Sequence, residues 1–251
     1  MIDIHTHLLP GVDDGSPSVD VSIPILQRFA ADGVQIVVCT PHLDASKTDR
    51  APHDRHLEIL SSLRARAAVS PELRLGWEIM LDRPGVDLRD KRLSLAGSSA
   101  VLVEFPRMMI PPNAADELFR LRMSGIVPVL AHPERYWGCT AEHVESWRRV
   151  GAVIQMDVVG MFATGPQGAL ATSLLERGLV DLLASDTHGD ARSLFPAQRW
   201  LLELGLDDVA DLLTRRNAAH LLASEALEAV PPVERRRGML GRLKELLLGS
   251  R

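Results

Sequence analysis

A chain of 251 residues, of which 46% are hydrophobic and 24% charged, can bury a full core as one domain. The net charge is −5, and no basic stripe dominates the body of the chain, which disfavours nucleic-acid binding. Two cysteines are too few for a disulfide framework, and no leader pattern or apolar run of membrane-spanning length occurs. We therefore expect a cytoplasmic protein from a reducing compartment.

Seven short apolar segments, rich in Val, Ile and Leu, are expected to form strands. They are mostly continuous rather than alternating, which is typical of strands buried on both faces. In chain order they are Ile2–His5, Gln35–Thr40, Leu73–Ile79, Ala100–Phe105, Val127–Ala131, Ala152–Met156 and Val180–Ala184. The amphipathic segments between them are expected to form helices at Ser18–Ala31, His53–Ala68, Pro112–Ser124, Thr140–Val150, Gly168–Arg177 and Arg192–Leu204.

Four of these helical segments are closely followed by a glycine, as is common at helix C-termini: Gly33, Gly125, Gly151 and Gly178. Alternation of strands and helices predicts a parallel sheet in an α/β fold. Seven strands in this length favour a closed or nearly closed barrel of the TIM type, and an open doubly wound sheet is the alternative.

The last residues differ in composition from the rest of the chain. After Pro231 and Pro232 comes VERRRGMLGRLKELLLGSR, which is basic on one side and rich in Leu and Met on the other. We expect a domain over residues 1–230 and a basic amphipathic helix over residues 231–251. Packing of this helix on the domain or on a second subunit is favoured over contact with a membrane surface.

Metal-binding side chains recur where the predicted strands end, which is the edge where α/β barrels build their active sites. Residues i and i+2 of a strand point the same way, so His5 and His7 can reach one point, and Asp186 and His188 can do so if the extended conformation persists. Imidazole and carboxylate without thiolate favour Zn, Mn, Fe or Co, and this number of ligands suits two or three metals. The nine candidates are His5, His7, Asp14, His42, Glu78, Glu104, His132, Asp186 and His188.

The remaining histidines and both cysteines fit ordinary structural roles. His53, His56, His143 and His220 fall in helix-like segments, where surface or packing positions are expected. Cys39 lies inside the apolar run IVVCT and is expected to be a buried thiol rather than a nucleophile, and Cys139 has no supporting pattern.

The strand-end motifs resemble those of a known family. DIHTHLLPGVDDG, CTPHL, GWEI, VEFP, AHPERY and ASDTH look like the motifs of the PHP (polymerase and histidinol phosphatase) superfamily, in that family's order. More narrowly, they resemble the CpsB/CapC group of metal-dependent bacterial tyrosine-protein phosphatases. The stretch LLTRRNAAHLL near Asn217 is similar to the usual C-terminal end of that group.

The resemblance implies a distorted seven-stranded barrel, the PHP fold, with a trinuclear site that often contains Mn²⁺; Zn²⁺ or Fe also suits the ligands. Carried over by motif, His5, His7, Glu78 and Asp186 would hold the first metal, and Glu78 would bridge to a second that Glu104 and His132 complete. Asp14, His42 and His188 would hold the third. A metal-activated hydroxide would then hydrolyse a phosphate monoester.

An arginine near the phosphate would stabilise the transferring oxygens. Arg135 in HPER matches the family's arginine and is our catalytic candidate; Arg107, after the EFP motif, is a weaker second one. The chain departs from the family where it reads QMDVVG, because Asp157 stands where the group often carries Asn. Asp157 would bind metal or pair with an arginine, and it puts the substrate preference in question.

The resemblance implies a phosphotyrosine phosphatase that acts on a bacterial tyrosine kinase in capsule or exopolysaccharide synthesis, with a homo-oligomer as a further option. A phosphatase for a small metabolite such as histidinol phosphate is the alternative. A lysine-dependent amidohydrolase is disfavoured, because Lys47, Lys91 and Lys244 are not at predicted strand ends. A non-catalytic metal-binding protein is also disfavoured, because none of the nine ligands is missing.

Overall fold

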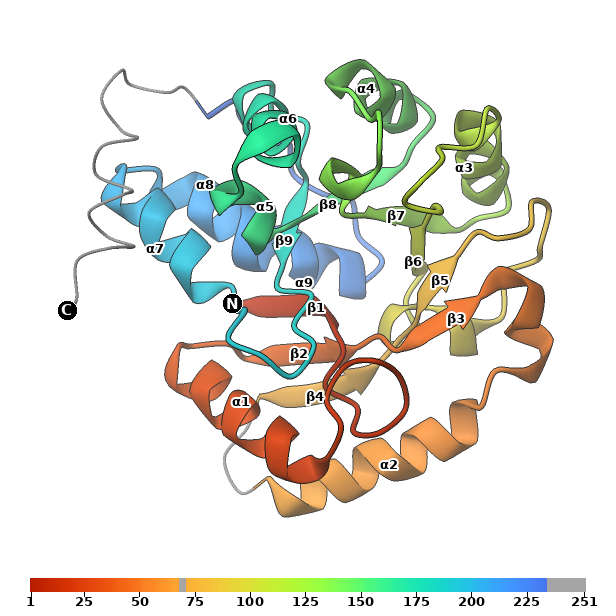
Figure 1. Cartoon of the computed structure of the whole chain (residues 1–251), viewed down its shortest axis with the longest axis vertical. Coiled ribbons are helices and arrows are strands. Elements are labelled where there is room, and N and C mark those ends of the chain that lie inside the picture. Colours follow the sequence, from red (N-terminus) through yellow and green to blue (C-terminus); the bar gives the residue numbers. More distant parts are fainter. Residues whose placement is uncertain (68–70, 234–251) are drawn as a thin grey trace.

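The computed structural model describes residues 1–67 and 71–233 (Figure 1). Residues 234–251 of the expected C-terminal helix and residue 68, at the end of one expected helix, lie outside the described residues. Within the described ranges, every helix is too short or too polar to cross a bilayer.

The fold is mixed α/β, and its strands form two parallel sheets within the described residues. One sheet has the order β1-β2-β4, and its strands are β1 (Ile2–Thr6), β2 (Ile36–Cys39) and β4 (Glu72–Leu75). The other has the order β3-β5-β6-β7-β8-β9, with β3 (His42–Asp44), β5 (Glu78–Met80), β6 (Ala100–Glu104), β7 (Val127–Ala131), β8 (Val153–Asp157) and β9 (Leu182–Ala184). The expected parallel arrangement is confirmed.

The described residues contain nine strands, because one of the seven expected strands is interrupted and an additional strand follows the second expected one. The strand expected at Leu73–Ile79 divides into β4 and β5, and the segment after β2 continues as β3. Pro41 has no N–H to continue a ladder. Pairing persists across the break, because Gly76 N–H donates to Cys39 O at 2.9 Å and Glu78 N–H donates to Pro41 O at 3.1 Å. At this break, both segments pass from one sheet to the other: β2 is followed by β3, and β4 is followed by β5.

The two sheets also meet where β1 ends. Asp186 N–H donates to His5 O at 3.0 Å, and His7 N–H donates to Thr187 O at 2.9 Å. Thr6 and Thr187 form an isolated parallel bridge. The backbone after β9 is therefore hydrogen-bonded to the end of β1, which brings the first and last strand ends of the fold together.

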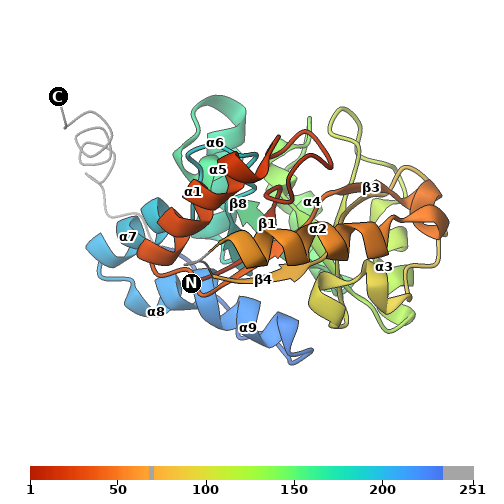
Figure 2. The same cartoon turned by 90° about the horizontal axis from the view of Figure 1, so that it is seen from below.

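The six expected helices are present with slightly different ends, and they lie outside the strands (Figures 1 and 2). They are α1 (Val19–Ala31), α2 (His53–Arg66), α3 (Ala114–Met123), α4 (Ala141–Arg149), α6 (Gly165–Glu176) and α7 (Phe195–Glu203). The four glycines expected at helix C-termini all have positive φ, between 63° and 94°. Residues other than glycine adopt such φ values at a cost in free energy.

The sequence did not predict several short helices. They are α5 (Val158–Phe162), α8 (Asp207–Asp211), the π-helix η5 (Leu212–Arg216), α9 (Asn217–Leu222), and the 3₁₀ turns η1 (Ala45–Arg50), η2 (Lys91–Leu93), η3 (Leu95–Gly97) and η4 (Pro133–Arg135). Periodicity is weak over so few residues. Asn217 has a structural role, because its amide donates to Asp181 O at 2.8 Å and accepts from Glu228 N–H at 2.9 Å.

Apolar side chains from the strands of both sheets pack into one cluster. Its buried members include Ile4 of β1, Val38 of β2, Leu102 of β6, Val129 of β7 and Leu182 of β9. Burying each such side chain contributes roughly 1.5–3 kcal/mol. A second, larger cluster lies between strands and helices. Together the two clusters fix the strand ends and hence the positions of the side chains that follow them.

Candidate metal centre

The structure brings all nine predicted ligands to the edge where β1, β2, β4, β6, β7 and β9 end. Each lies at a strand terminus or in the loop that follows a strand, which is where α/β barrels place their active-site residues. His5 is in β1, His7 and Asp14 follow it, His42 begins β3, Glu78 begins β5, Glu104 ends β6, His132 follows β7, and Asp186 and His188 follow β9. Eight of them form three overlapping groups, and His132 adjoins these groups through its contact with Glu78.

The first group, His5, His7, Glu78 and Asp186, is buried. His5 Nε2 lies 3.2 Å from His7 Nε2, 3.3 Å from Glu78 Oε2 and 3.3 Å from Asp186 Oδ1. His7 Nε2 lies 3.2 Å from both of these oxygens. Four ligands at about 2.0 Å from a tetrahedral cation are about 3.3 Å apart. The cage therefore has the size that a divalent transition metal requires.

The donor chemistry also fits a cation. Asp186 Oδ1 is buried and receives no hydrogen bond from the described residues, which is unusual for a buried carboxylate oxygen. Burial alone would lower the pKa of His5, but the carboxylates of Glu78 and Asp186 raise it to about 9. Burial would raise the pKa of Glu78, but His5 and His132 hold it well below its usual range. The two carboxylates thus face imidazole nitrogens across a small buried space, where they favour positive charge.

The second group adjoins the first at Glu78. His132 Nε2 is 2.7 Å from Glu78 Oε1 and 3.8 Å from Glu104 Oε2. His42 Nδ1 is 2.9 Å from Glu78 Oε2 and 3.9 Å from Glu104 Oε1. Burial and the charge of Glu78 raise the pKa of Glu104, and a cation between the two carboxylates would relieve this repulsion. The geometry adds His42 to the Glu78, Glu104 and His132 set expected from the motifs.

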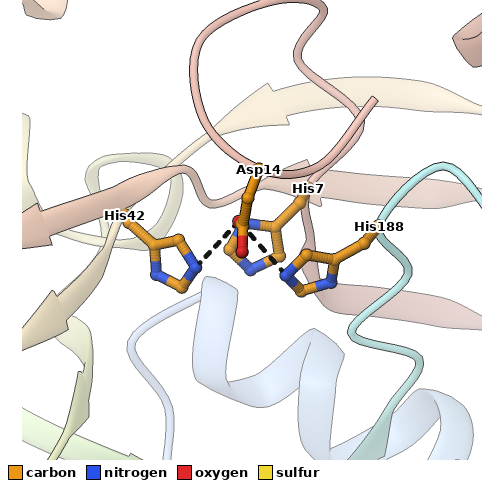
Figure 3. Close-up of side chains that lie close together, drawn as sticks. All are labelled: His7, Asp14, His42 and His188. Carbon is orange, nitrogen blue, oxygen red and sulfur yellow. Dashed lines mark ion pairs between the residues drawn. The ribbon is translucent and has the colours of Figure 1, made fainter. Parts of the chain in front are cut away.

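The third group, His7, Asp14, His42 and His188, lies toward solvent. Figure 3 shows the carboxylate of Asp14 between two imidazoles. Its Oδ1 is 3.2 Å from His42 Nε2 and 3.5 Å from His188 Nε2. The His7 ring stacks on that of His188 with 4.1 Å between centroids. This group contains the Asp14, His42 and His188 set expected from the motifs and adds His7.

Hydrogen bonds behind the imidazoles fix their orientation. His5 Nδ1 is 3.0 Å from Gln155 Oε1, and His7 Nδ1 is 2.7 Å from Asp13 Oδ2. Such contacts leave the Nε2 atoms free for a metal. The sequence analysis assigned no role to Asp13 or Gln155. Their positions in the sequence could have indicated these roles, because Asp13 is next to Asp14 and Gln155 is two residues before Asp157.

Asp157 pairs with an arginine, which answers the question raised by the QMDVVG stretch. The buried Asp157 carboxylate forms an ion pair with Arg135 Nη2, and Arg135 Nη1 lies 2.6 Å from Asp186 Oδ2. Gln155 Nε2 donates to the other Asp157 oxygen at 3.0 Å. Arg192, which the sequence analysis did not select, lies 3.3 Å from Asp186 Oδ2. Two guanidinium groups therefore adjoin the first metal group.

Two candidate ligands have strained backbones. His132 has φ 35° and Asp186 has φ 46°, in the left-handed region that residues with a Cβ seldom adopt. His132 N–H donates to Gln155 O at 2.8 Å, which ties the first of these turns to β8. Each such residue costs on the order of 1–3 kcal/mol, and strain of this kind gathers at functional sites.

The residues expected to be ordinary lie away from these groups within the described chain. The His56 ring packs against Trp77 in a tilted arrangement with 4.7 Å between centroids, and His143 caps α4. Burial raises the pKa of the Cys39 thiol to about 12, so this cysteine is a poor nucleophile. Arg107 is exposed, and no ion pair to it is found among the described residues.

The chain belongs to the CpsB/CapC family of capsular polysaccharide synthesis, because the sequence model of that family matches residues 1–223. Among similar proteins is the tyrosine-protein phosphatase YwqE of Bacillus subtilis, 26% identical over 254 residues, which cover 94% of this chain and 98% of YwqE. The tyrosine-protein phosphatase CpsB of Streptococcus pneumoniae is 29% identical over 219 residues, or 80% of this chain and 88% of CpsB.

A solved structure agrees with these sequence relationships. It comes from a study of YwqE from B. subtilis and CpsB from S. pneumoniae, described there as unique metal-dependent tyrosine phosphatases. It matches with a TM-score of 0.76 and 25% identity, covering 94% of this chain and all of the other. The family expected from the strand-end motifs is confirmed.

Proposed function

We propose that this protein is a metal-dependent phosphotyrosine phosphatase that acts on a protein, in line with the names of its relatives. The observation that carries the proposal is the buried cage of His5, His7, Glu78 and Asp186, whose ligand separations of 3.2–3.3 Å suit a divalent cation. The two adjoining groups give room for further cations, and sites with two metals are used by phosphatases to stabilise the attacking and leaving oxygens.

The proposed ligand sets follow the three groups. His5, His7, Glu78 and Asp186 would hold one metal; Glu78, Glu104 and His132, with His42 beside them, a second; and Asp14, His42 and His188 a third. Bound divalent metals supply positive charge for a phosphate ester and lower the pKa of water. We propose Mn²⁺ as the native metal, with Zn²⁺ or Fe as alternatives that the same ligands accept.

Arg135 is our proposed catalytic residue. Its guanidinium is only 14% exposed and is held by Asp157 and Asp186, so its position is fixed before substrate arrives. A preset donor of this kind stabilises charge that develops on transferring oxygens. Because two carboxylates already engage Arg135, part of its effect would come from holding Asp186 against the metal cage.

Three wider expectations remain proposals. The bonds between the end of β1 and the segment after β9 support a closed, distorted seven-stranded barrel, which an experimental structure with these segments apart would refute. The family description supports a bacterial tyrosine kinase of capsule or exopolysaccharide synthesis as the substrate. We also propose a cytoplasmic location, with residues 231–251 as a separate tail. Fractionation with the membrane would contradict this location.

The deciding experiment measures phosphate release by metal-stripped protein refilled with Mn²⁺, Zn²⁺, Co²⁺ or Fe²⁺. A phosphotyrosyl peptide and histidinol phosphate are offered side by side. We expect fast release from the peptide, little from histidinol phosphate, and the highest rate with Mn²⁺. A preference for histidinol phosphate would replace the proposal with a metabolic phosphatase that has the same centre. Absence of release with every metal would refute phosphatase activity.

A further inference from the structure

An apolar cavity of about 510 Å³ opens between α5 and α7, two helices that contact each other and lie next to each other in Figure 1. Its walls include Val158, Val159, Phe162, Phe195 and Trp200. Phe162 and Trp200 meet edge to face with 6.5 Å between ring centroids. A cavity of this size can take a large aliphatic or aromatic side chain.

On both sides of the cavity, lining residues lie close to the first metal group. Val158 directly follows Asp157, which is paired with Arg135. On the other side, Arg192 lines the cavity and also lies 3.3 Å from Asp186 Oδ2. Arg192 therefore marks the boundary between the cavity and the first metal group. A substrate with its phosphate at the metals can extend from there over Arg192 into the cavity.

The rim of the cavity leaves apolar side chains in contact with solvent. Val159 is 41% exposed and Phe195 is 38% exposed. Apolar surface that adjoins a polar centre in this way is typical of a binding surface. Acidic side chains contribute little to the walls, where Glu203 is the acidic residue and is paired with Arg199 at 2.9 Å. An apolar side chain attached to an anionic group fits these surroundings.

We propose that this cavity binds an apolar side chain of the substrate polypeptide, from a residue close in sequence to the phosphotyrosine. The inference rests on the proposed function and adds a sequence preference to it. The metals and Arg135 would recognise the phosphate, and the cavity would select among phosphotyrosyl segments. A small phosphate ester would occupy the metal centre alone.

The test compares kcat/KM for p-nitrophenyl phosphate with values for a set of phosphotyrosyl peptides. The peptides share a Ser/Ala background, and each carries one Leu at a different position within three residues of the phosphotyrosine. For the wild-type protein we expect Leu at one position to raise kcat/KM about tenfold, which is the usual value of a well-bound apolar group. The rate with p-nitrophenyl phosphate serves as the measure of an intact metal centre.

Two variants then locate the effect. Val159→Asp places a charge on the rim, and Phe195→Ala removes part of one wall. Both should abolish the Leu preference and leave p-nitrophenyl phosphate turnover within about twofold of wild type. Phe119→Ala on α3 is the matched control, because Phe119 is 50% exposed and lies outside the cavity. It should keep the preference.

Several results would overturn the inference. If the wild-type protein hydrolyses every peptide equally, the proposed function stands and the cavity has no selective role. If Phe195→Ala and Phe119→Ala behave alike, or if the rim variants change both kinds of substrate equally, the cavity is structural. If no phosphotyrosyl peptide is hydrolysed while p-nitrophenyl phosphate is, the proposed function itself fails, and the inference fails with it.

Discussion

The buried and the exposed sides of the metal centre use the same side-chain types in different surroundings. On the buried side, His5 and His7 are fully buried, and Glu78 and Asp186 are each 1% exposed. On the exposed side, the Asp14 side chain is 71% exposed and that of His42 is 39% exposed. Gln155 and Asp13 hydrogen-bond to the Nδ1 atoms of the buried His5 and His7, whereas Asp14 belongs to a surface loop.

The difference indicates a division of roles. Buried ligands are held by packing and hydrogen bonds before a metal arrives, so their cage is preorganised. An exposed carboxylate keeps water as an alternative partner and gains less from each contact. We therefore expect the buried side to hold its metal tightly and the exposed side to exchange metal and receive substrate.

The largest expected effect comes from His5→Ala. The variant should lose turnover by about a thousandfold, because metal-derived charge stabilisation is worth several kcal/mol, and its metal content should fall. Turnover and metal content by mass spectrometry check this. Full activity in His5→Ala would remove the buried group from the mechanism. His143→Ala, on the surface of α4, is the control and should retain both properties.

Arg135→Ala should slow turnover by about 100-fold while the metals remain bound, because it removes a preset donor. The variant also leaves Asp157 buried without its cation, which costs about 3–5 kcal/mol of stability. The double variant Arg135→Ala with Asp157→Asn should recover thermal stability but not turnover. An unchanged rate in Arg135→Ala would assign this residue a purely structural role.

Gln155→Ala sharpens the comparison, because it removes a hydrogen bond behind the buried cage without removing a ligand. Metal affinity should fall about tenfold, as is usual when a residue that orients a metal-binding histidine is lost. Titration of metal-stripped protein with Mn²⁺ measures this. The activity at saturating metal should stay close to wild type. Equal affinity in the two proteins would show that Gln155 does not orient His5.

Asp14→Ala should have the smallest effect, with about fivefold weaker metal binding at the exposed group and unchanged binding at the buried group. Metal stoichiometry after dialysis distinguishes the groups, since the exposed metal should be lost first. If Asp14→Ala lost the same metal as His5→Ala, the two sides would form one cooperative site. The proposed division into a tight buried side and an exchanging exposed side would then be wrong.

Much of the site could be predicted from the sequence because strand ends are local features. His5 and His7 share a strand face by their spacing alone, and each later motif closes a predicted strand. The interruption of the third expected strand and the extra strand β3 were missed, because Pro41 and Gly76 act through pairing with a neighbouring strand. Gln155 was missed as a partner of His5 because the two residues are 150 positions apart.

The sequence by itself determined an alternating α/β chain, its family, and nine candidate imidazole and carboxylate ligands at predicted strand ends. Only the tertiary structure decided how these ligands divide into a buried and an exposed side, that Asp157 neutralises Arg135, and that Arg192 separates the metal centre from an apolar cavity. The physical reason is that residue type and residue spacing along a strand are properties of short segments, so they can be read without the fold. Burial, charge pairing and cavities arise between segments that only folding brings together.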